Sequence, residues 1–202
     1  MKIEIRNVTK VIKKTRVIDN VDITFEGGKI YGLSGKNGCG KTMLMRLISG
    51  LIYPTEGEVI IDGKILGKDC SFPKSIGLLI ENPAFLEEYT AYENLRMLNG
   101  VGGNRLDKEE ILSLIQSVGL DPHDSRKYYK FSLGMRQRLG IAAAIMGKPD
   151  VILLDEPINA IDEDGVSEIR DLVRSLSGED RIIIIACHDK EEMEYMADEI
   201  IY

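Results

Sequence analysis

The sequence predicts an α/β fold with a mainly parallel sheet, and three observations lead to this prediction. Residues 151–154 and 181–186 have the near-continuous apolar character of strands that are buried on both faces of a sheet. Segments with helical apolar spacing alternate with such strands, as they do in α/β proteins. A strand-like run at 29–33 also passes through a glycine-rich loop into a helical run at 43–48.

The length and composition are those of one soluble globular domain. With 202 residues, of which 44% are hydrophobic and 29% charged, the chain can bury a substantial core. Its net charge of −7 argues against broad electrostatic binding to nucleic acid or to anionic lipid. The longest apolar runs fall far short of the roughly 20 residues that a membrane helix needs. Three scattered cysteines suggest neither a zinc site nor a disulfide framework, so a reducing cytosol is the simplest location.

The first part of the chain has the patterns of strands and turns. Residues 3–8 and 17–25 alternate apolar and polar side chains, which is typical of half-buried strands. Residues 58–63 are predicted to form a strand that closes on an Asp-Gly turn. Residues 75–80 are predicted to form another short strand, which the following Glu-Asn-Pro sequence ends.

From that point to about residue 147 the pattern is helical. The segments with helical spacing are 91–99, 108–118 and 135–146. We expect a single domain, 1–202, in which a helical subdomain at about 83–147 is inserted into a core formed by about 1–82 and 148–202. Further helices are predicted at 162–176 and 190–197. Because the strand-like residues 199–202 end the sequence, we expect either a truncated chain or a naturally short tail.

The loop after the strand at 29–33 matches the pattern G-x-x-x-x-G-K-[ST] of a phosphate-binding loop. Its glycines let several backbone N–H groups turn toward one anion, and the following helix adds its positive dipole end. Lys41 is expected to reach the β- and γ-phosphates, and the Thr42 hydroxyl a magnesium ion. The alternative is a glycine-rich turn that binds nothing. The expected nucleotide-binding residues of the loop are Gly35, Lys36, Asn37, Gly38, Cys39, Gly40, Lys41 and Thr42.

Two carboxylates directly follow the buried strand at 151–154. Ligands bind at the carboxyl ends of parallel strands. Asp155 can hold magnesium there, and Glu156 can polarise an attacking water. The pair could instead be solvent-exposed acidic residues at a strand end, but the phosphate-binding loop upstream favours the functional interpretation.

His188, Ser132 and Gly134 are weaker candidates. His188 follows the strand at 181–186 and could hydrogen-bond a γ-phosphate and align water, although a lone histidine is more often structural. Ser132 and Gly134 stand at the start of a helix, where free N–H groups form a second place for an anion. From local physics alone, an ordinary N-cap by Ser132 is the favoured interpretation.

Together these stretches resemble the nucleotide-binding subunit of the ATP-binding cassette (ABC) family, over essentially the whole chain. The motifs stand in the order that the family has: Walker A at 35–42, the signature loop at 131–135, Walker B at 151–156, the D-loop at 159–162 and the switch histidine at 188. The resemblance implies a P-loop NTPase core with a mainly parallel sheet, an N-terminal antiparallel β subdomain and an inserted α-helical subdomain.

The resemblance also implies an ATPase that uses ATP and Mg²⁺. The implied catalytic residues are Lys41, Glu156 and His188, and the implied metal ligands are Thr42, Asp155 and Glu81. The implied nucleotide contacts outside the phosphate-binding loop are Ile12, Ser132, Gly134 and Asp162. In the family two subunits face each other head to tail, so that the signature loop of one covers the ATP that the other holds.

The implied partners are a second nucleotide-binding subunit, with a homodimer expected, and a transmembrane permease subunit. No nucleic acid is expected. The implied location is cytoplasmic, on the inner face of the cell membrane through the membrane subunit. Phe85, Leu86 and Tyr89 lie where the family docks a helix of that subunit, although they could equally belong to the core of the helical subdomain.

Two positions depart from the family pattern. Glu81 replaces the glutamine of the Q-loop, and its carboxylate can still ligate magnesium while adding like charge beside Asp155 and Glu156. Together with the signature at 132–135, this glutamate resembles the bacitracin-resistance and lantibiotic-immunity branch, which predicts an exporter of peptides, antibiotics or other amphipathic molecules. Ile12 stands where an adenine-stacking aromatic is expected, so a weaker apolar contact would replace stacking.

Two other functions compete with transport. A non-transport cassette that acts on DNA or ribosomes is disfavoured by the acidic balance and by the single cassette. An inactive regulatory cassette is disfavoured by Glu156 and His188, whereas Glu81 and the missing aromatic leave room for it.

Overall fold

The centre of the molecule is a parallel sheet. A computed structural model describes residues 1–36, 38–101, 103 and 106–202. Within these residues a five-stranded sheet has the order β6-β7-β8-β3-β9, and each pair in it is parallel. Its strands are β3 (Lys29–Leu33), β6 (Ile76–Leu79), β7 (Val151–Asp155), β8 (Ile182–Ala186) and β9 (Glu199–Ile201). The predicted α/β fold is confirmed.

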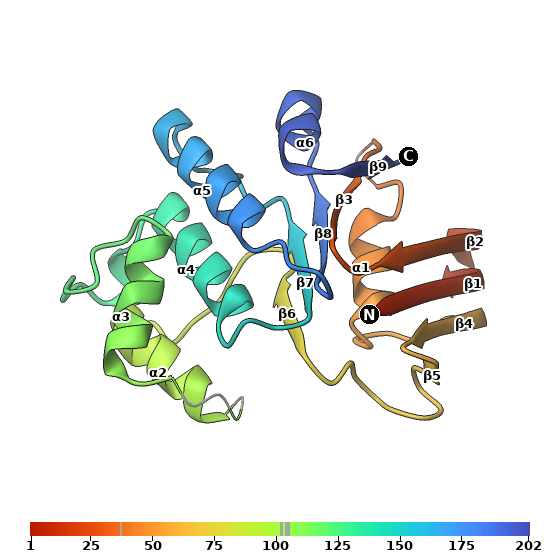
Figure 1. The fold of residues 1–202 in the computed structure, drawn as a ribbon, viewed down its shortest axis with the longest axis horizontal. Coiled ribbons are helices and arrows are strands. Elements are labelled where there is room, and N and C mark those ends of the chain that lie inside the picture. The colour runs from red at the N-terminus through yellow and green to blue at the C-terminus, as the bar shows by residue number, and fades with distance from the viewer. Residues whose placement is uncertain (37, 102, 104–105) are drawn as a thin grey trace.

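A smaller antiparallel sheet lies beside the parallel one, with the order β2-β1-β4-β5 (Figure 1). Its strands are β1 (Lys2–Ile12), β2 (Thr15–Glu26), β4 (Glu56–Ile61) and β5 (Lys64–Ile65). Lys13 and Lys14 form the turn between β1 and β2 with φ of 44° and 69°, as tight hairpin turns require. Both strands are longer than predicted, because register shifts along the hairpin break the alternation of side chains before the pairing ends.

Each face of the parallel sheet covers a core of its own. Along β7, Val151 and Leu153 pack toward the antiparallel sheet and the helix α1 (Lys41–Ile48). Ile152 and Leu154 alternate with them and pack toward the helices on the other face. This arrangement explains why β7 and β8 have near-continuous apolar sequences.

The remaining helices cover the second face or lie at its side (Figure 1). Between β6 and β7 in the chain come α2 (Ala91–Val101), α3 (Lys108–Ser117), a 3₁₀ turn (Tyr128–Lys130) and α4 (Leu133–Ile145). After β7 and β8 come α5 (Glu163–Ser175) and α6 (Lys190–Met196). The helix predicted to begin at 135 begins two positions earlier because Ser132 caps it, with its Oγ accepting a hydrogen bond from the Met135 N–H at 3.2 Å.

The carboxyl ends of the central strands lie in register. Ala186, at the end of β8, pairs with Leu33 at the end of β3 and with Asp155 at the end of β7. On the next strand, Leu79 of β6 pairs with Leu154. The loops that follow these four strands therefore leave the sheet at one edge, where ligands bind in α/β folds.

Candidate functional site

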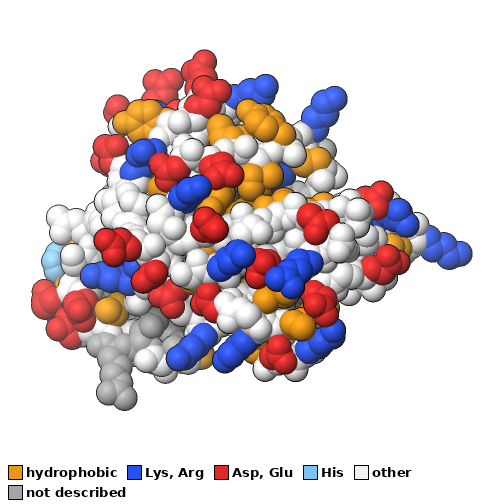
Figure 2. Space-filling model, turned by 45° about the vertical axis from the view of Figure 1, so that its right-hand side comes forward, with side chains coloured by type: hydrophobic (Ala, Val, Ile, Leu, Met, Phe, Trp, Pro, Cys, Tyr) orange, Lys and Arg blue, Asp and Glu red, His pale blue; other side chains and the backbone are white. Residues whose placement is uncertain are grey.

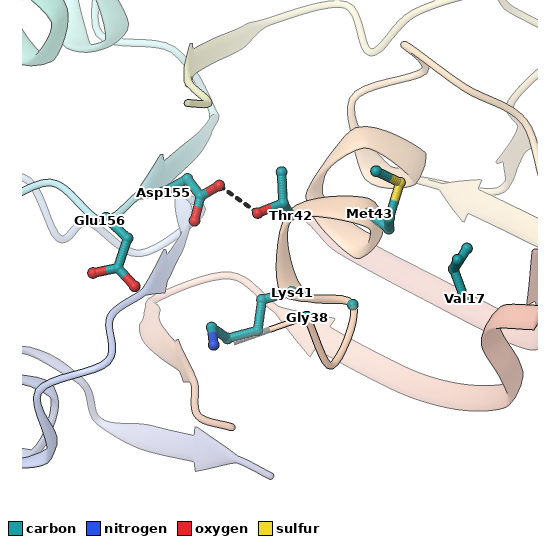
Figure 3. A pocket seen from close by; sticks show the side chains of 8 residues that line it. Val17, Gly38, Lys41, Thr42, Met43, Asp155 and Glu156 are labelled. Carbon is teal, nitrogen blue, oxygen red and sulfur yellow. Dashed lines mark hydrogen bonds between the residues drawn. The ribbon is translucent and has the colours of Figure 1, made fainter. Parts of the chain in front are cut away.

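A cavity of about 390 Å³ opens at this carboxyl edge (Figure 3). Its walls come from Val17 of β2, from Gly38 and Gly40 of the glycine-rich loop, from Lys41, Thr42 and Met43 of α1, and from Asp155 and Glu156 after β7. In the close-up, Lys41 and Glu156 occupy one side and Val17 the opposite side. The fold thus brings three segments that are distant in sequence to one polar cavity with an apolar wall.

The loop at 35–42 is shaped to bind an anion at the start of α1. Gly40 has φ of 109°, and a Cβ at this position would lie 2.9 Å from the Val17 carbonyl oxygen. The N-cap of α1 is Gly40, which has no side chain, so among the described residues the first N–H groups of the helix receive no side-chain cap from this position. Lys41 Nζ donates to the Gly35 carbonyl oxygen at 2.6 Å, which keeps its charge beside the loop. Asn37, also expected to bind nucleotide, lies outside the described residues.

Thr42 and Asp155 meet across the cavity. The Thr42 hydroxyl donates to Asp155 Oδ2 at 2.6 Å. Burial raises the pKa of the Asp155 carboxyl above its ordinary value, the Thr42 hydrogen bond lowers it, and the charge of Glu156 raises it again. The two side chains therefore present oxygen atoms to the cavity, and the carboxylate among them is buried. Hard cations such as Mg²⁺ prefer oxygen donors of this kind.

Glu156 and His188 form a second pair at the same edge. His188 Nδ1 lies 2.7 Å from Glu156 Oε2. A carboxylate only accepts hydrogen bonds, so the Nδ1 atom carries the proton in this contact. The Nε2 atom of a neutral His188 is then an acceptor, and this ring donates to a phosphate only when it is doubly protonated.

Cys187 lies beside this pair, but its thiol is unreactive. One ligand atom each of Glu156, Cys187 and His188 lie within 4.8 Å of one another. Burial raises the pKa of the Cys187 thiol to about 11. The thiol is therefore protonated at neutral pH and is a poor metal ligand, because the thiolate is the ligating form. The cluster is better suited to proton transfer than to metal binding.

Glu81 stands apart from the expected metal ligands. Its Oε1 accepts a hydrogen bond from the Arg46 guanidinium at 2.6 Å, and its φ of 61° turns the chain at the end of β6. It does not line the cavity. Its charge still contributes to raising the pKa of Asp155, as the smallest of the named causes. The structure thus pairs Glu81 with Arg46, a cation of α1 that lies about one helical turn after Thr42.

Ser132, Gly134 and Asp162 also lie away from the cavity. Ser132 and Asp162 are the N-caps of α4 and α5. A separate hollow of about 350 Å³ is lined by Leu133 and Ala160, neighbours of these residues in sequence, together with residues of the loop after β6. The signature and D-loop segments are therefore together, and in the same chain they do not line the cavity beside the loop at 35–42.

Ile12 does not line the cavity. It ends β1, where it pairs with Thr15, and its side chain is 37% exposed. Val17 and Met43 supply the apolar wall instead. Sequence reasoning missed both because neither belongs to a motif, although Val17 begins the strand predicted at 17–25.

Comparisons with known proteins agree with this geometry. A family model described as ABC transporter matches residues 18–159. The uncharacterised ABC transporter ATP-binding protein YybJ of Bacillus subtilis (strain 168) is 53% identical over 97% of the chain and 89% of its own length. The bacitracin transport ATP-binding protein BcrA of Enterococcus faecalis is 40% identical over 98% of the chain and 65% of its own length. The lantibiotic transport ATP-binding protein SrtF of Streptococcus pyogenes is 35% identical over 97% of the chain and 84% of its own length.

Among solved structures, the dimeric post-hydrolysis state of the ATP-binding cassette MJ0796, bound to ADP and Pi, superposes with a TM-score of 0.88 at 25% identity. The alignment covers 99% of the chain described here and 93% of that chain. A second dimeric structure of the same cassette gives a TM-score of 0.86 at 26% identity.

Proposed function

Because the chain belongs to the ABC transporter family, as an ATP-hydrolysing nucleotide-binding subunit, we propose that Lys41, Glu156 and His188 carry out the hydrolysis. The observation that carries this assignment is the 2.7 Å contact between Glu156 and His188 at the edge of the cavity that Lys41 and Thr42 line. The resemblance expected from the five motifs is confirmed.

The two steps of the reaction need different groups. Lys41 and the free N–H groups at the start of α1 bind and neutralise the phosphates. Glu156 then accepts a proton from the attacking water, while the Nδ1–H of His188 holds the carboxylate in place. In the tautomer that carries its proton on Nδ1, the Nε2 atom of His188 can accept a hydrogen bond from that water.

Thr42 and Asp155 are the residues that would hold Mg²⁺. Their oxygen atoms already lie 2.6 Å apart, and the raised pKa of Asp155 reports a buried charge with insufficient compensation, so the donor set fits this ion. When bound, Mg²⁺ supplies charge neutralisation for the phosphate oxygens. Glu81 would join these ligands only after leaving Arg46.

The site is half of a composite site in our proposal. Ser132 and Gly134 lie at the N-terminus of α4, outside the cavity, and two copies in a head-to-tail dimer would place them over the nucleotide of the partner. Supporting this, the signature residue Leu133 is 72% exposed, and the cassette with the TM-score of 0.88 is a dimer. Because each copy carries both halves of the site, two copies of this chain are sufficient to form the complete sites.

The other partner that we propose is a membrane permease. The described helices do not combine the length and the apolar character that crossing a bilayer requires. A hollow of about 270 Å³ lies beside the loop after β6 and is lined by Pro83, Phe85 and Leu98 among others. Leu86, next to it in sequence, is 53% exposed. We propose that this surface docks a permease segment on the cytoplasmic side of the membrane.

The cargo we propose is a peptide, an antibiotic or another amphipathic molecule, moved outward. This follows from the similarity to the bacitracin and lantibiotic transport proteins. Nucleic acid is not the expected partner. On the face that Figure 2 shows, Lys and Arg side chains are interspersed with Asp and Glu, so they do not form a continuous basic surface there.

Replacing Glu156 tests the function directly. In Glu156→Gln the amide cannot accept the proton, so we expect the ATP turnover number to fall by about 10²–10⁴-fold while ATP still binds and an ATP-bound dimer accumulates. Turnover is measured by phosphate release and the dimer by gel filtration. Glu194→Gln, an exposed change on α6, is the matched control. Normal turnover in Glu156→Gln would refute the assignment.

A further inference from the structure

A buried glutamine on α4 holds the backbone of the proposed catalytic base. Gln137 lies in the second turn of α4 and is 7% exposed. Its Nε2 atom donates a hydrogen bond to the carbonyl oxygen of Glu156 at 2.8 Å. This contact links the helical segment between β6 and β7 to the residue that follows β7.

Glu156 has an unusual backbone that needs such support. Its φ is 50°, in the left-handed region that non-glycine residues seldom adopt. Its N–H donates to the Ala186 carbonyl oxygen at 2.8 Å, and its own carbonyl oxygen also accepts from the Asn159 N–H at 3.1 Å. Unfavourable backbone conformations persist where surrounding contacts over-determine them. Gln137 is the one side chain among these three partners, and it comes from a different element.

We propose that Gln137 is a positioning residue for Glu156, and that through it α4 connects the two ATP sites of a dimer. The first part follows from the hydrogen bonds: fixing the peptide group on the carboxyl side of Glu156 fixes the direction in which its carboxylate leaves the chain, toward His188. The second part rests on the proposed dimer. The same helix begins at Ser132, which would contact the partner's nucleotide, whereas Gln137 acts on the base of its own site.

A purely structural role for Gln137 makes a different prediction. A buried amide that only satisfies polar atoms contributes to the stability of the fold, and its loss weakens every function of the protein alike. A positioning residue acts through Glu156, so its loss has an effect only while Glu156 can act as a base. Mutations that act through one group are not additive, whereas independent ones are.

The experiment uses two variants of the full chain in the presence of Mg²⁺ and ATP. Gln137→Met and Gln137→Glu keep the length of the side chain and remove the N–H donor. A displacement of about 1 Å in a reacting group can cost about 10²-fold in rate. We expect an approximately 10-fold lower kcat in both variants, with the Kd for ATP changed less than about twofold. Gln116→Met, on the exposed face of α3, is the matched control and keeps wild-type kcat.

The decisive comparison repeats Gln137→Met in the Glu156→Gln background. We expect no further loss of the residual rate there, measured in single-turnover experiments. An equal loss in both backgrounds, an unchanged kcat in folded Gln137→Met, or failure of both Gln137 variants to fold would each overturn the positioning role. If Glu156→Gln alone retains turnover, the proposed function of Glu156 is what fails, so the two failures are distinguishable.

Discussion

A buried carboxylate lowers the stability of the folded state when no cation compensates its charge. Asp155 is almost fully buried, and burial is the largest cause of its raised pKa. An acid with a higher pKa in the folded than in the unfolded state binds more protons when folded. Its contribution to stability is therefore lost as the pH rises from the ordinary aspartate value of about 3.9 through the folded-state value. At neutral pH the protein without nucleotide carries this cost in full.

Asp155→Asn removes that cost. We expect the nucleotide-free variant to melt above the wild type at pH 7, and each kcal/mol gained in stability moves the melting temperature of a chain of this size by about 2–4 °C. The difference should shrink toward pH 4 as the wild-type carboxyl becomes protonated, and the variant should lose Mg²⁺-dependent turnover. Thermal unfolding followed by circular dichroism measures the melting temperatures, and phosphate release measures the turnover. Asp171→Asn, an exposed change on α5, should show no such shift at any pH. A less stable Asp155→Asn at pH 7 would contradict the argument.

At the scale of residues, the sequence predicts which side chains lie at the edge of the sheet, but not which residues they contact. That Thr42 and Asp155 lie close together could be predicted from the motifs, because strand–loop–helix connections place such residues at one edge of a sheet. The pairing of Glu81 with Arg46 could not, because no motif states which side of α1 carries a cation. The role of Val17 in the cavity wall could not be predicted either, because the hairpin turn after Ile12 decides which residue faces the cavity.

At the scale of elements, α4 begins with a close contact. A Cβ on Gly134 would lie 2.7 Å from the Ala160 carbonyl oxygen, which is nearer than real Cβ contacts come. Ala160 itself has φ of 63°, so its carbonyl group has little freedom to move away. The glycine thus lets the first turn of α4 approach the D-loop segment at 159–162. Helical spacing predicted the helix but carried no information about this approach, because contacts between elements are not local.

Gly134→Ala should damage the protein, and Gly100→Ala should help it. The first change forces Ala160 away, so we expect a loss of stability of about 1–3 kcal/mol and weaker ATP-dependent dimerisation. The second lies in α2, where an added Cβ meets none of the described atoms within 4 Å, so alanine should stabilise the helix by about 0.5–1 kcal/mol. Urea denaturation measures both changes. A tolerant Gly134→Ala would show that the D-loop segment yields easily.

At the scale of the whole molecule, the surface beside the loop after β6 contains one residue that packs into the core and one that is exposed for docking. The ring of Phe85 lies 5.3 Å from that of Tyr128 and packs against the helical core. Leu86 is exposed, and its backbone is held by the buried side chain of Asn94, which both accepts from its N–H and donates to its carbonyl oxygen. From the sequence, both residues could belong either to the core or to an interface. In the structure Phe85 is partly buried against the core, and Leu86 is exposed.

Alanine substitution at these two positions should therefore have different effects. We expect Leu86→Ala to leave stability within about 0.5 kcal/mol while reducing co-purification with the membrane subunit. Phe85→Ala should lower stability by about 1–3 kcal/mol, because it removes a partly buried ring from the core. Pull-down from membranes and thermal unfolding separate the two effects. Intact assembly in Leu86→Ala would remove Leu86 from the docking surface.

The pairing of β3 has a consequence for how the chain is made. β3 ends at Leu33, yet its neighbours in the sheet are β8 (Ile182–Ala186) and β9 (Glu199–Ile201). A ribosome that adds about 5–20 residues per second leaves β3 without either partner for about 8–30 s. The phosphate-binding loop is thus among the first segments to emerge and among the last to take its place. Until then both edges of β3 are open to wrong partners, so the yield of active protein depends on how well the nascent chain is shielded.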